Sequence, residues 1–328
     1  MSDTPILIFN PASAAGKTGR RKDEVLRKIA DQLGAVDVVE TTASGDAIRL
    51  ARAATDSGRR RVLVGGGDGT LSEVANGVLE ATKGGSGGPA LGLLPLGSGF
   101  DFARSLALPR DLGGALSVIS DGHTRFVDAA RVELTESHGS PRSVFVVNEA
   151  GAGLSAITIR IVGRFAKRVG ARVGFAAGAV AAILSHRPTP MTIEVDGDIA
   201  FTGPVSLVVA ANGRFFGAGM KIAPQATIDD GLLQVVIIRG MSLPQLLLNL
   251  PSLFAGTHGK HPRVSFYAAR SMSISPVAND SAMPIELDLD GEAYGQAPIH
   301  VEVVPSALEI FAPVAPIAKE ATTMGDPS

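Results

Sequence analysis

Residues 61–81 read RVLVGGGDGTLSEVANGVLEA, the most informative segment of the chain for its fold class. Residues 61–64 predict a β-strand with the apolar run Val62–Val64, and three glycines and Asp68 follow them. Thr70 and Glu73 fit an S/T-x-x-E capping box, which predicts a helix from there to about Glu80. Such a turn lets backbone N–H groups approach an anion at a helix N-terminus, so it predicts a phosphate site. The alternative is a tight turn that needs glycine only for positive φ.

Strands and helices alternate around this turn from residue 5 to about residue 122. Expected strands cover residues 5–9, 35–39, 61–64 and 90–94, and expected helices end near Gly34, Gly58 and Glu80. This order predicts a mainly parallel sheet with helices on both faces. Because parallel strands end at one edge, we expect the loops at Asn10-Pro11, Gly65–Thr70 and Gly97–Arg104 to converge there.

The pattern changes near Thr124. From there to about residue 312 the chain has short β-rich runs, with helical segments expected at about 155–185 and 243–254. Consecutive strands without helices between them predict an antiparallel sheet or sandwich. The fold class is therefore an α/β nucleotide-binding domain followed by an antiparallel β-sandwich domain. The tail 314–328 is expected to be disordered.

Composition excludes several classes of protein. The 328 residues include 39 Gly and no Cys, so a thiolate nucleophile, a disulfide framework and thiolate-bound metals are absent. Thirty basic and 32 acidic residues leave no overall basic charge for nucleic acid, and no nucleic-acid partner is expected. The apolar runs 5–9 and 175–184 are too short for a signal peptide or a membrane span, so a cytoplasmic protein is expected.

Several known motifs are tested and rejected. Gly16-Lys17-Thr18 has the end of a Walker A loop, but Pro11 occupies the position of its first glycine. Gly151-x-Gly153-x-x-Ala156 resembles a dinucleotide fingerprint, yet it lies where the pattern is β-rich. The six histidines form no metal-binding motif, and no G-x-S-x-G elbow is present.

Six stretches together resemble the diacylglycerol kinase catalytic family, which includes sphingosine and ceramide kinases. They are NPAS (10–13), TTASGDA (41–47), GGGDGTLSEVANG (65–77), LGLLPLGSGFDFAR (91–104), NGRFFGAGMKIAPQATIDDGLL (212–233) and DGE (290–292). The resemblance implies an ATP-binding domain at 1–128, rejoined by a returning segment at about 299–313. It also implies a lipid-substrate domain at 129–298.

The resemblance further implies an ATP site in the first domain. The residues it places on ATP are Asn10, Pro11, Ala12, Ser13, Ala14, Thr41, Gly67, Asp68, Gly69, Thr70, Leu71, Ser72, Glu73, Ser98 and Asp101. Two positions depart from the family, which usually has Gly at position 14 and Asn at position 100. Such changes beside a nucleotide could weaken its binding.

Magnesium is the second cofactor that the resemblance implies. Asp68, Asp101 and Asp128 match acidic positions linked to the Mg²⁺ that accompanies ATP. The segment 227–232 resembles a structural Mg²⁺ loop whose ligands would be the Asp230 carboxylate and the backbone carbonyls of Thr227 and Leu232. These are oxygen donors, which Mg²⁺ prefers.

The late DGE motif supplies the candidate catalytic residues. Along 284–290 the acidic side chains Glu286, Asp288 and Asp290 alternate with apolar ones on a predicted strand. The plain alternative is a solvated acidic face ending in an Asp-Gly turn, as at Asp196-Gly197. With the resemblance, Glu292 is the expected catalytic base, assisted by Asp290.

The expected activity is ATP- and Mg²⁺-dependent phosphorylation of a lipid hydroxyl, such as that of diacylglycerol or a sphingoid base. The alternatives are a kinase of a soluble substrate, because NAD kinases also carry a GGDGT loop, and a catalytically weak nucleotide- or lipid-binding regulator. The basic and apolar stretch 160–184 could contact a membrane or simply pack in the core. The expected partner is a lipid substrate at a membrane surface, with peripheral association at the inner membrane face. The oligomeric state is open, and a homodimer is one option.

Overall fold

The computed structural model of the chain describes residues 4–97, 99–135, 140–159, 184, 186–217, 219–277 and 284–314. Three predictions therefore lie wholly or mostly outside the described residues. They concern the nucleotide contact of Ser98, the membrane or packing role of 160–184, and the tail after residue 314. Of the helix expected at about 155–185, residues 154–159 are helical and the rest is not described apart from residue 184.

The first domain contains the predicted parallel sheet. Its strands pair in the order β2-β1-β3-β4, with parallel registers throughout. The strands are β1 (Ile6–Phe9), β2 (Asp37–Glu40), β3 (Arg61–Gly66) and β4 (Ala90–Pro95). The helices are α1 (Lys17–Arg20), α2 (Lys22–Leu33), α3 (Asp46–Asp56), α4 (Asp68–Ala81), α5 (Asp101–Ser105) and α6 (Leu112–Asp121).

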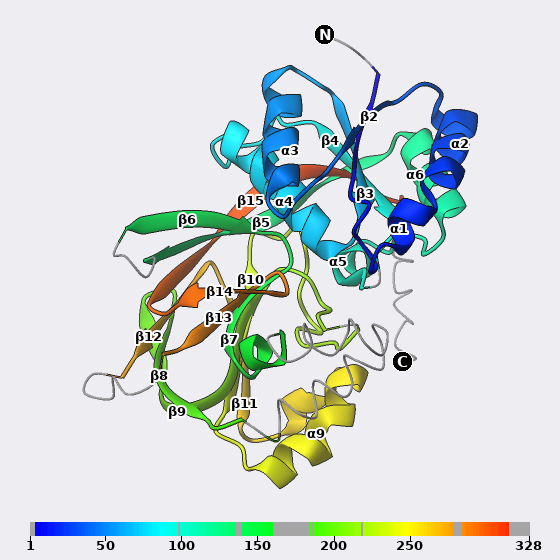
Figure 1. The fold of residues 1–328 in the computed structure, drawn as a ribbon. Helices are drawn as coiled ribbons and strands as arrows, with labels where there is room; N and C mark the ends of the chain where they lie inside the picture. Colours follow the sequence, from blue (N-terminus) through cyan, green and yellow to red (C-terminus); the bar gives the residue numbers. More distant parts are fainter. Residues whose placement is uncertain are drawn as a thin grey trace, which may run out of the picture.

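Helices cover both faces of this sheet, as the alternating pattern predicts (Figure 1). On one face the apolar side of α3 and the buried side of α4 pack against β1, β3 and β4. On the other face Val25 and Ile29 of α2 and Leu112 and Leu116 of α6 pack against the same strands. The helix expected to end near Gly34 is α2, and its C-cap Gly34 has a φ of 79°.

The predicted capping box at Thr70 is wrong. Helix α4 begins at Asp68, with Gly67 as its N-cap. The Thr70 hydroxyl accepts a hydrogen bond from Asn10, and the Glu73 carboxylate accepts bonds from the amides of Gly45 and Ala47. Both side chains are thus bonded to other segments, because α4 lies between β1 and the start of α3. The sequence has the capping-box motif, but its two side chains form hydrogen bonds with other segments of the chain and do not cap α4.

The second domain is built from antiparallel strands, and the fold class prediction is confirmed. Its strands are β5 (Thr124–Thr135), β6 (Pro141–Val146), β7 (Glu149–Gly153), β8 (Thr189–Val195), β9 (Asp198–Ala211), β10 (Leu233–Arg239), β11 (Val264–Ala269), β12 (Ser271–Pro276), β13 (Glu286–Leu289), β14 (Glu292–Gln296) and β15 (Ile299–Phe311). They run in the order β14-β13-β7-β9-β8-β12-β15, with β10 and β11 continuing from β9. Strand β7 carries the Gly151 motif and pairs antiparallel with β9 and β13, so the rejection of a dinucleotide fingerprint is confirmed.

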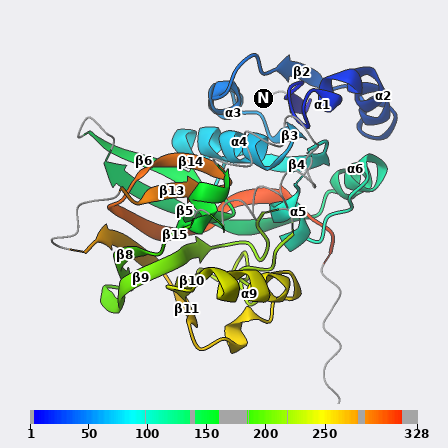
Figure 2. The same cartoon turned by 60° about the horizontal axis from the view of Figure 1, so that its bottom comes forward.

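Two apolar cores fill the second domain. The larger lies among β5, β7, β8, β9, β10, β12, β13 and β15, and alternate strand residues such as Val208, Leu287 and Val301 point into it. The smaller lies between the other side of β9 and β10 and helix α9 (Leu243–Ala255), which the sequence predicted at 243–254. Figure 2 shows α9 beside β10 and β11 on the outside of this domain.

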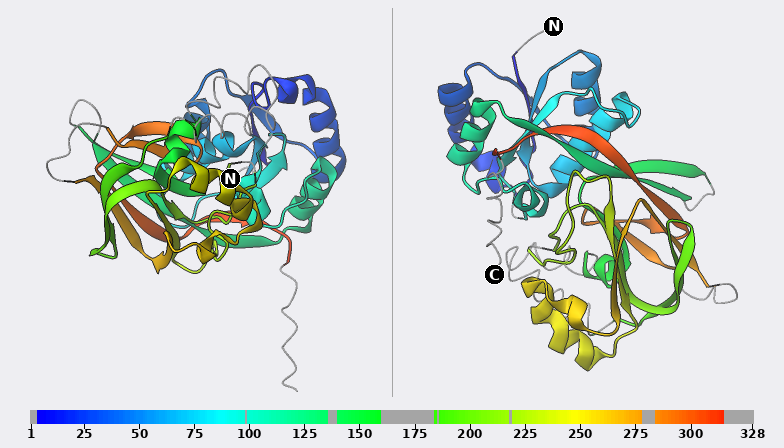
Figure 3. Two further views of the ribbon diagram at one scale, coloured as in Figure 1. Left: turned by 90° about the horizontal axis from the view of Figure 1, so that it is seen from below. Right: turned by 180° about the vertical axis from the view of Figure 1, so that it is seen from behind.

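Strand β15 connects the two domains. It pairs antiparallel with β12 and with the full length of β5, and near its end Ile310 pairs with Leu91 of the parallel sheet. Figure 3 shows this strand passing from the second domain into the first. The boundary expected between residues 128 and 129 falls inside β5. The domains therefore share two long strands and are not joined by a linker at that point.

Within the part of the chain that the structure describes, no helix has both the length and the apolar character needed to cross a membrane.

Candidate active site

The two glycine loops at the carboxyl edge of the parallel sheet touch each other. A Cβ atom on Gly97 would lie 2.3 Å from the Cα atom of Gly67, and one on Gly67 would lie 3.5 Å from the hydroxyl of Ser13. Real side chains do not pack at the first of these distances, so the loop after β4 requires glycine at position 97, where it crosses Gly67. The predicted convergence of the loops after β1, β3 and β4 is correct.

Asn10 ties the first loop to the start of α4. Its side-chain N–H group donates to the Thr70 hydroxyl over 2.9 Å, and its side-chain oxygen Oδ1 accepts the backbone amide of Ala12 over 3.0 Å. After this turn Ala14 has a φ of 51°, a left-handed conformation that costs a residue with a Cβ about 1–2 kcal/mol. The glycine that the family usually has at position 14 would avoid this cost.

Asp68 holds the second loop through its backbone. Its carboxylate accepts the amide of Phe100 at 2.7 Å and that of Asp101 at 3.1 Å, at the start of α5. A Cβ on Gly99 would lie 2.4 Å from the same carboxylate, which explains glycine at that position. Burial raises the pKa of Asp68, and the amide bonds and Arg104 oppose that rise. Phe100 itself has a φ of 63°, where the family's usual Asn would be better tolerated.

Glu73 fixes the loop before α3. Its carboxylate accepts the amides of Gly45 over 2.8 Å and Ala47 over 3.1 Å, at the N-terminus of α3, where the helix dipole favours a negative charge. The amide of Thr41 bonds to Phe9 of β1. These contacts bring Thr41 and Glu73, both predicted on ATP, to the same edge as the glycine loops.

Glu292 reaches this edge from the second domain. Strands β13 and β14 form a hairpin in which Leu289 pairs with Glu292 across Asp290 and Gly291. A Cβ on Gly69 would lie 3.3 Å from Oε1 of Glu292, so its carboxylate packs against the start of α4. Partial burial raises the pKa of Glu292, and the negative charges of Glu73 and Asp290 raise it further.

Asp290 has a different role from Glu292. Its carboxylate accepts the amides of Val147, Asn148 and Glu149 at 2.9 to 3.1 Å. The hydroxyl of Ser72, a residue predicted on ATP, donates to Asp290. Asp290 is buried, so the alternative of a solvated acidic face is wrong for this residue. With its oxygens used in this way, Asp290 positions the hairpin that carries Glu292.

A buried pair of carboxyl groups lies behind the hairpin, and sequence reasoning missed it. Glu149 and Asp288 are 2% and 1% exposed, and they share a hydrogen bond, which requires a proton on one of the two. Burial raises the pKa of Asp288 to about 7 and raises that of Glu149 well above its usual value. The alternative of a solvated acidic face is therefore wrong for Asp288 as well. Nothing in the sequence around Glu149 indicates its burial.

Helix α4 also contacts the second domain directly. Asn76 donates to the carbonyl of Phe145 over 2.7 Å and accepts the amide of the same residue over 2.8 Å. Leu71 points the other way, into the core of the first domain. The helix that begins at the glycine loop therefore also positions β6 and the Asp290 hairpin, which keeps the parts of the site in register.

The predicted structural Mg²⁺ loop lies beside Asp128. The carboxylate of Asp128 accepts the amides of Gly231 and Ser306, and Asp230 accepts the amide of Leu232. Among the described residues no group of three or more His, Asp or Glu side chains could hold a metal ion. A Mg²⁺ ion at 227–232 would thus depend on one carboxylate and on backbone carbonyls, a donor set of oxygens that fits the ion.

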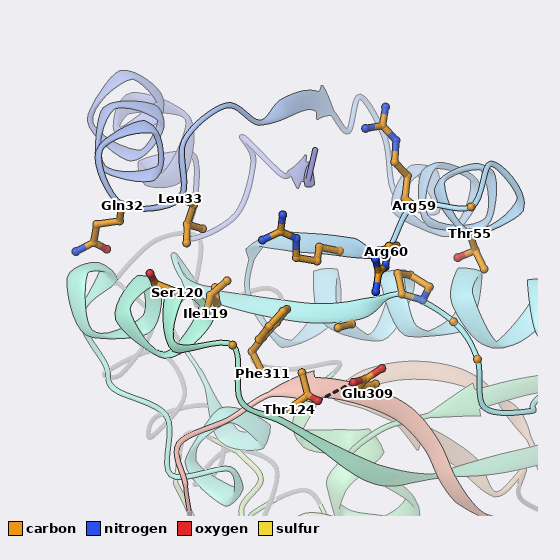
Figure 4. A pocket seen from close by; sticks show the side chains of 17 residues that line it. Gln32, Leu33, Thr55, Arg59, Arg60, Ile119, Ser120, Thr124, Glu309 and Phe311 are labelled. Atoms are coloured by element: carbon orange, nitrogen blue, oxygen red, sulfur yellow. Dashed lines mark hydrogen bonds between the residues drawn. The ribbon is translucent and has the colours of Figure 1, made fainter. Parts of the chain in front are cut away.

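A groove of about 820 Å³ lies at the opposite edge of the parallel sheet (Figure 4). It is lined by the residues that precede β3 and β4, including Arg59 and Arg60, and by Glu309 near the end of β15. Glu309 accepts a hydrogen bond from Thr124, and Arg59 pairs with Asp37. None of the predicted site residues lines this groove.

Comparisons with known proteins agree with this arrangement. Residues 4–132 match the family model of the diacylglycerol kinase catalytic domain, and residues 148–312 match the YegS C-terminal NAD kinase beta sandwich-like domain. A diacylglycerol kinase of Staphylococcus epidermidis is 30% identical over 94% of this chain and 91% of its own. One from Staphylococcus aureus is 28% identical over the same shares.

Solved structures share the fold. That of a diacylglycerol kinase from Bacillus anthracis superimposes with a TM-score of 0.70 at 19% identity, covering 95% of this chain and 98% of that one. Yeast NADH kinase gives a TM-score of 0.52 at 13% identity, covering 95% of this chain and 84% of that one. The matched family models, the long alignments and the shared fold lead to one conclusion. The chain belongs to the diacylglycerol kinase family of lipid kinases.

Proposed function

We propose that the protein transfers the γ-phosphate of ATP, with Mg²⁺, to the hydroxyl of a lipid such as diacylglycerol or a sphingoid base. The observation that carries the proposal is the contact between Glu292 of the second domain and Gly69 of the glycine loop. It places a carboxylate with a raised pKa beside the backbone cradle that suits phosphate groups.

The first domain would hold the nucleotide mainly through its backbone. The N-terminus of α4, with Gly67 and Gly69, offers amide donors and the positive end of a helix dipole to phosphate oxygens. Asn10 and Asp68 hold the two flanking loops in place through the hydrogen bonds described above. Mg²⁺ would supply charge neutralisation on the phosphates when bound.

The second domain would supply the acceptor and its base. Phosphoryl transfer needs positioning, charge neutralisation and a group that takes the proton of the attacking hydroxyl. Glu292 takes that proton as the acceptor oxygen bonds to phosphorus and the bond to the leaving diphosphate oxygen breaks. A raised pKa suits a base that works near neutral pH. Asp290 keeps the hairpin on the amides of 147–149 throughout.

The test is an incubation of the purified protein with labelled ATP, Mg²⁺ and a total lipid extract. We expect label in one lipid class, which is then identified, and no label without Mg²⁺. Label only in water-soluble products would favour a kinase of a soluble substrate. Binding of ATP without any labelled product would favour a regulator and contradict the proposal.

A further inference from the structure

Helix α9 is apolar on two sides and carries no charged residue along its 13 positions. One side packs on the smaller core of the second domain, through the buried Leu246 and the partly buried Leu250 and Leu253. A helix that is apolar all round is normally enclosed on all sides. The part of α9 that does not face this core is nevertheless open to solvent.

The rest of the α9 surface exposes large apolar side chains. Leu248 is 80% exposed and Phe254 is 48% exposed, and Leu243 and Leu247 are each 38% exposed. No other helix or strand in the described ranges exposes more than one large apolar residue. Single exposed apolar residues are ordinary, whereas a cluster on one element marks a contact surface. We name these four residues the α9 face.

Positive charge borders the α9 face. Residues 231–279 contain no Asp or Glu, but they include Lys260 and Arg263 in the segment between α9 and β11. Lys221 packs on the C-terminal end of the helix, where its Cδ lies 3.3 Å from the position of a Cβ on Gly256. Lys221, Lys260 and Arg263 are all exposed. An apolar helix face with a basic border and no acidic residue complements a bilayer surface that contains anionic lipids.

We propose that the α9 face is where the protein docks on a lipid bilayer, with its leucines in the interface and Lys221 and Lys260 on anionic headgroups. This inference rests on the proposed function, because a lipid acceptor must be reached at a membrane surface. A second copy of the chain fits less well, since the basic border of one copy would meet that of the other. Figure 2 shows that α9 lies on the outside of the second domain.

The test compares vesicle binding with catalysis. The variant Leu247→Gln/Leu248→Gln and the control Ile199→Gln are sedimented with phosphatidylcholine vesicles that contain phosphatidylglycerol. Ile199 is 68% exposed on β9 and lies outside the α9 face. We expect the double variant to bind about tenfold more weakly or worse, since two apolar side chains no longer leave water. The control should bind normally, and Lys260→Gln should weaken binding only when phosphatidylglycerol is present.

Kinase assays on two forms of the acceptor separate docking from chemistry. The double variant should lose phosphorylation of diacylglycerol held in vesicles and keep phosphorylation of short-chain diacylglycerol dispersed in detergent. Normal vesicle binding by the double variant would overturn the inference, and so would equal loss of both activities. A dimer in analytical ultracentrifugation that the double variant disrupts, with vesicle binding unchanged, would also overturn it. Failure of the wild-type protein to phosphorylate any lipid would count against the proposed function, while the vesicle result would still test α9.

Discussion

Two hairpins of the second domain have the same turn and different surroundings. Asp196-Gly197 joins β8 to β9, and Asp290-Gly291 joins β13 to β14. The φ angles are 51° and 87° in the first turn and 50° and 83° in the second, as a two-residue hairpin turn with right-handed strand twist requires. In both, the aspartate accepts backbone amides from a neighbouring strand segment.

The difference lies in what each turn packs against. Asp196 is exposed and accepts the amides of Arg270 and Ser271 through one oxygen. Asp290 is buried, and both of its carboxylate oxygens accept backbone amides of residues 147–149. Glu292, the first residue after this turn, lies against the glycine loop of the other domain. The Asp-Gly sequence thus determines the turn, whereas tertiary packing determines whether it can take part in chemistry. The predictions below test this contrast.

The largest effect is expected at the residue after each turn. Glu292→Gln should lower the turnover number by about 10²- to 10⁴-fold, because it removes the base that takes the hydroxyl proton. The matched variant Asp198→Asn changes the equivalent residue of the other hairpin and should leave turnover unchanged. Steady-state kinase assays of both variants make the comparison. Equal turnover for the two would place Glu292 outside the chemistry.

The second-largest effect is expected at the aspartate of each turn, and it concerns the free energy of unfolding. In Asp290→Asn one acceptor oxygen becomes an N–H donor that faces a backbone donor, so we expect a loss of about 2–3 kcal/mol in the free energy of unfolding. Asp196→Asn keeps the one oxygen that accepts both amides, and its loss should stay below about 0.5 kcal/mol. Urea denaturation of the two variants measures the difference. A similar small loss for both would contradict the anchoring role of Asp290.

The buried pair behind the second hairpin predicts a pH dependence. The raised pKa values of Glu149 and Asp288 mean that the folded state keeps a proton that the unfolded state releases above about pH 4. Their contribution to stability therefore falls as the pH rises from about 4 through about 7. Glu149→Gln donates to Asp288 without titrating. It should raise the melting temperature relative to wild type by about 3 °C or more at pH 8, and by less at pH 5.

The exposed Glu302→Gln is the control for this experiment. It should not change the slope of melting temperature against pH. A Glu149→Gln variant that follows the wild-type slope would show that the pair holds no shared proton.

The smallest effect concerns residues at positive φ. Both hairpins place aspartate there, a residue that tolerates this conformation, but the nucleotide edge places Ala14 there. Ala14→Gly should raise the free energy of unfolding by up to about 1 kcal/mol. Ala107 is exposed and has a φ of 56°, so Ala107→Gly should raise the free energy of unfolding by a similar amount. Only Ala14→Gly should also change the affinity for ATP. Equal ATP affinities of the two variants would show that the turn at Ala14 does not contact the nucleotide.

Local pattern was enough to predict much of the fold. The alternating pattern predicted the helix that ends at Gly34, strand runs predicted β3 and β4, and the glycine loops converged as the ends of parallel strands must. Pattern could not show that the boundary near residue 128 falls inside β5, because the strand continues through both domains.

The site was harder to predict than the fold. Resemblance named Glu292, and the contact with Gly69 supports it. Ser72 and Thr70 also came from motif matching; their hydroxyls bond to Asp290 and Asn10, and their contacts with ATP stay predictions. The burial of Glu149 depends on strands more than a hundred residues apart in sequence, so no local signal could reveal it. The Mg²⁺ loop and the nucleotide contacts stay predictions.

The central claim is that the first domain holds the nucleotide while the Asp290 hairpin presents the base. It is tested most directly by measuring ATP affinity by calorimetry and single-turnover phosphate transfer on one preparation of Glu292→Gln. We predict a dissociation constant for ATP within about twofold of the wild-type value together with loss of transfer, which marks an interaction made only during the reaction. Transfer at the wild-type rate would contradict the account, and so would a loss of ATP binding large enough to explain the whole decline.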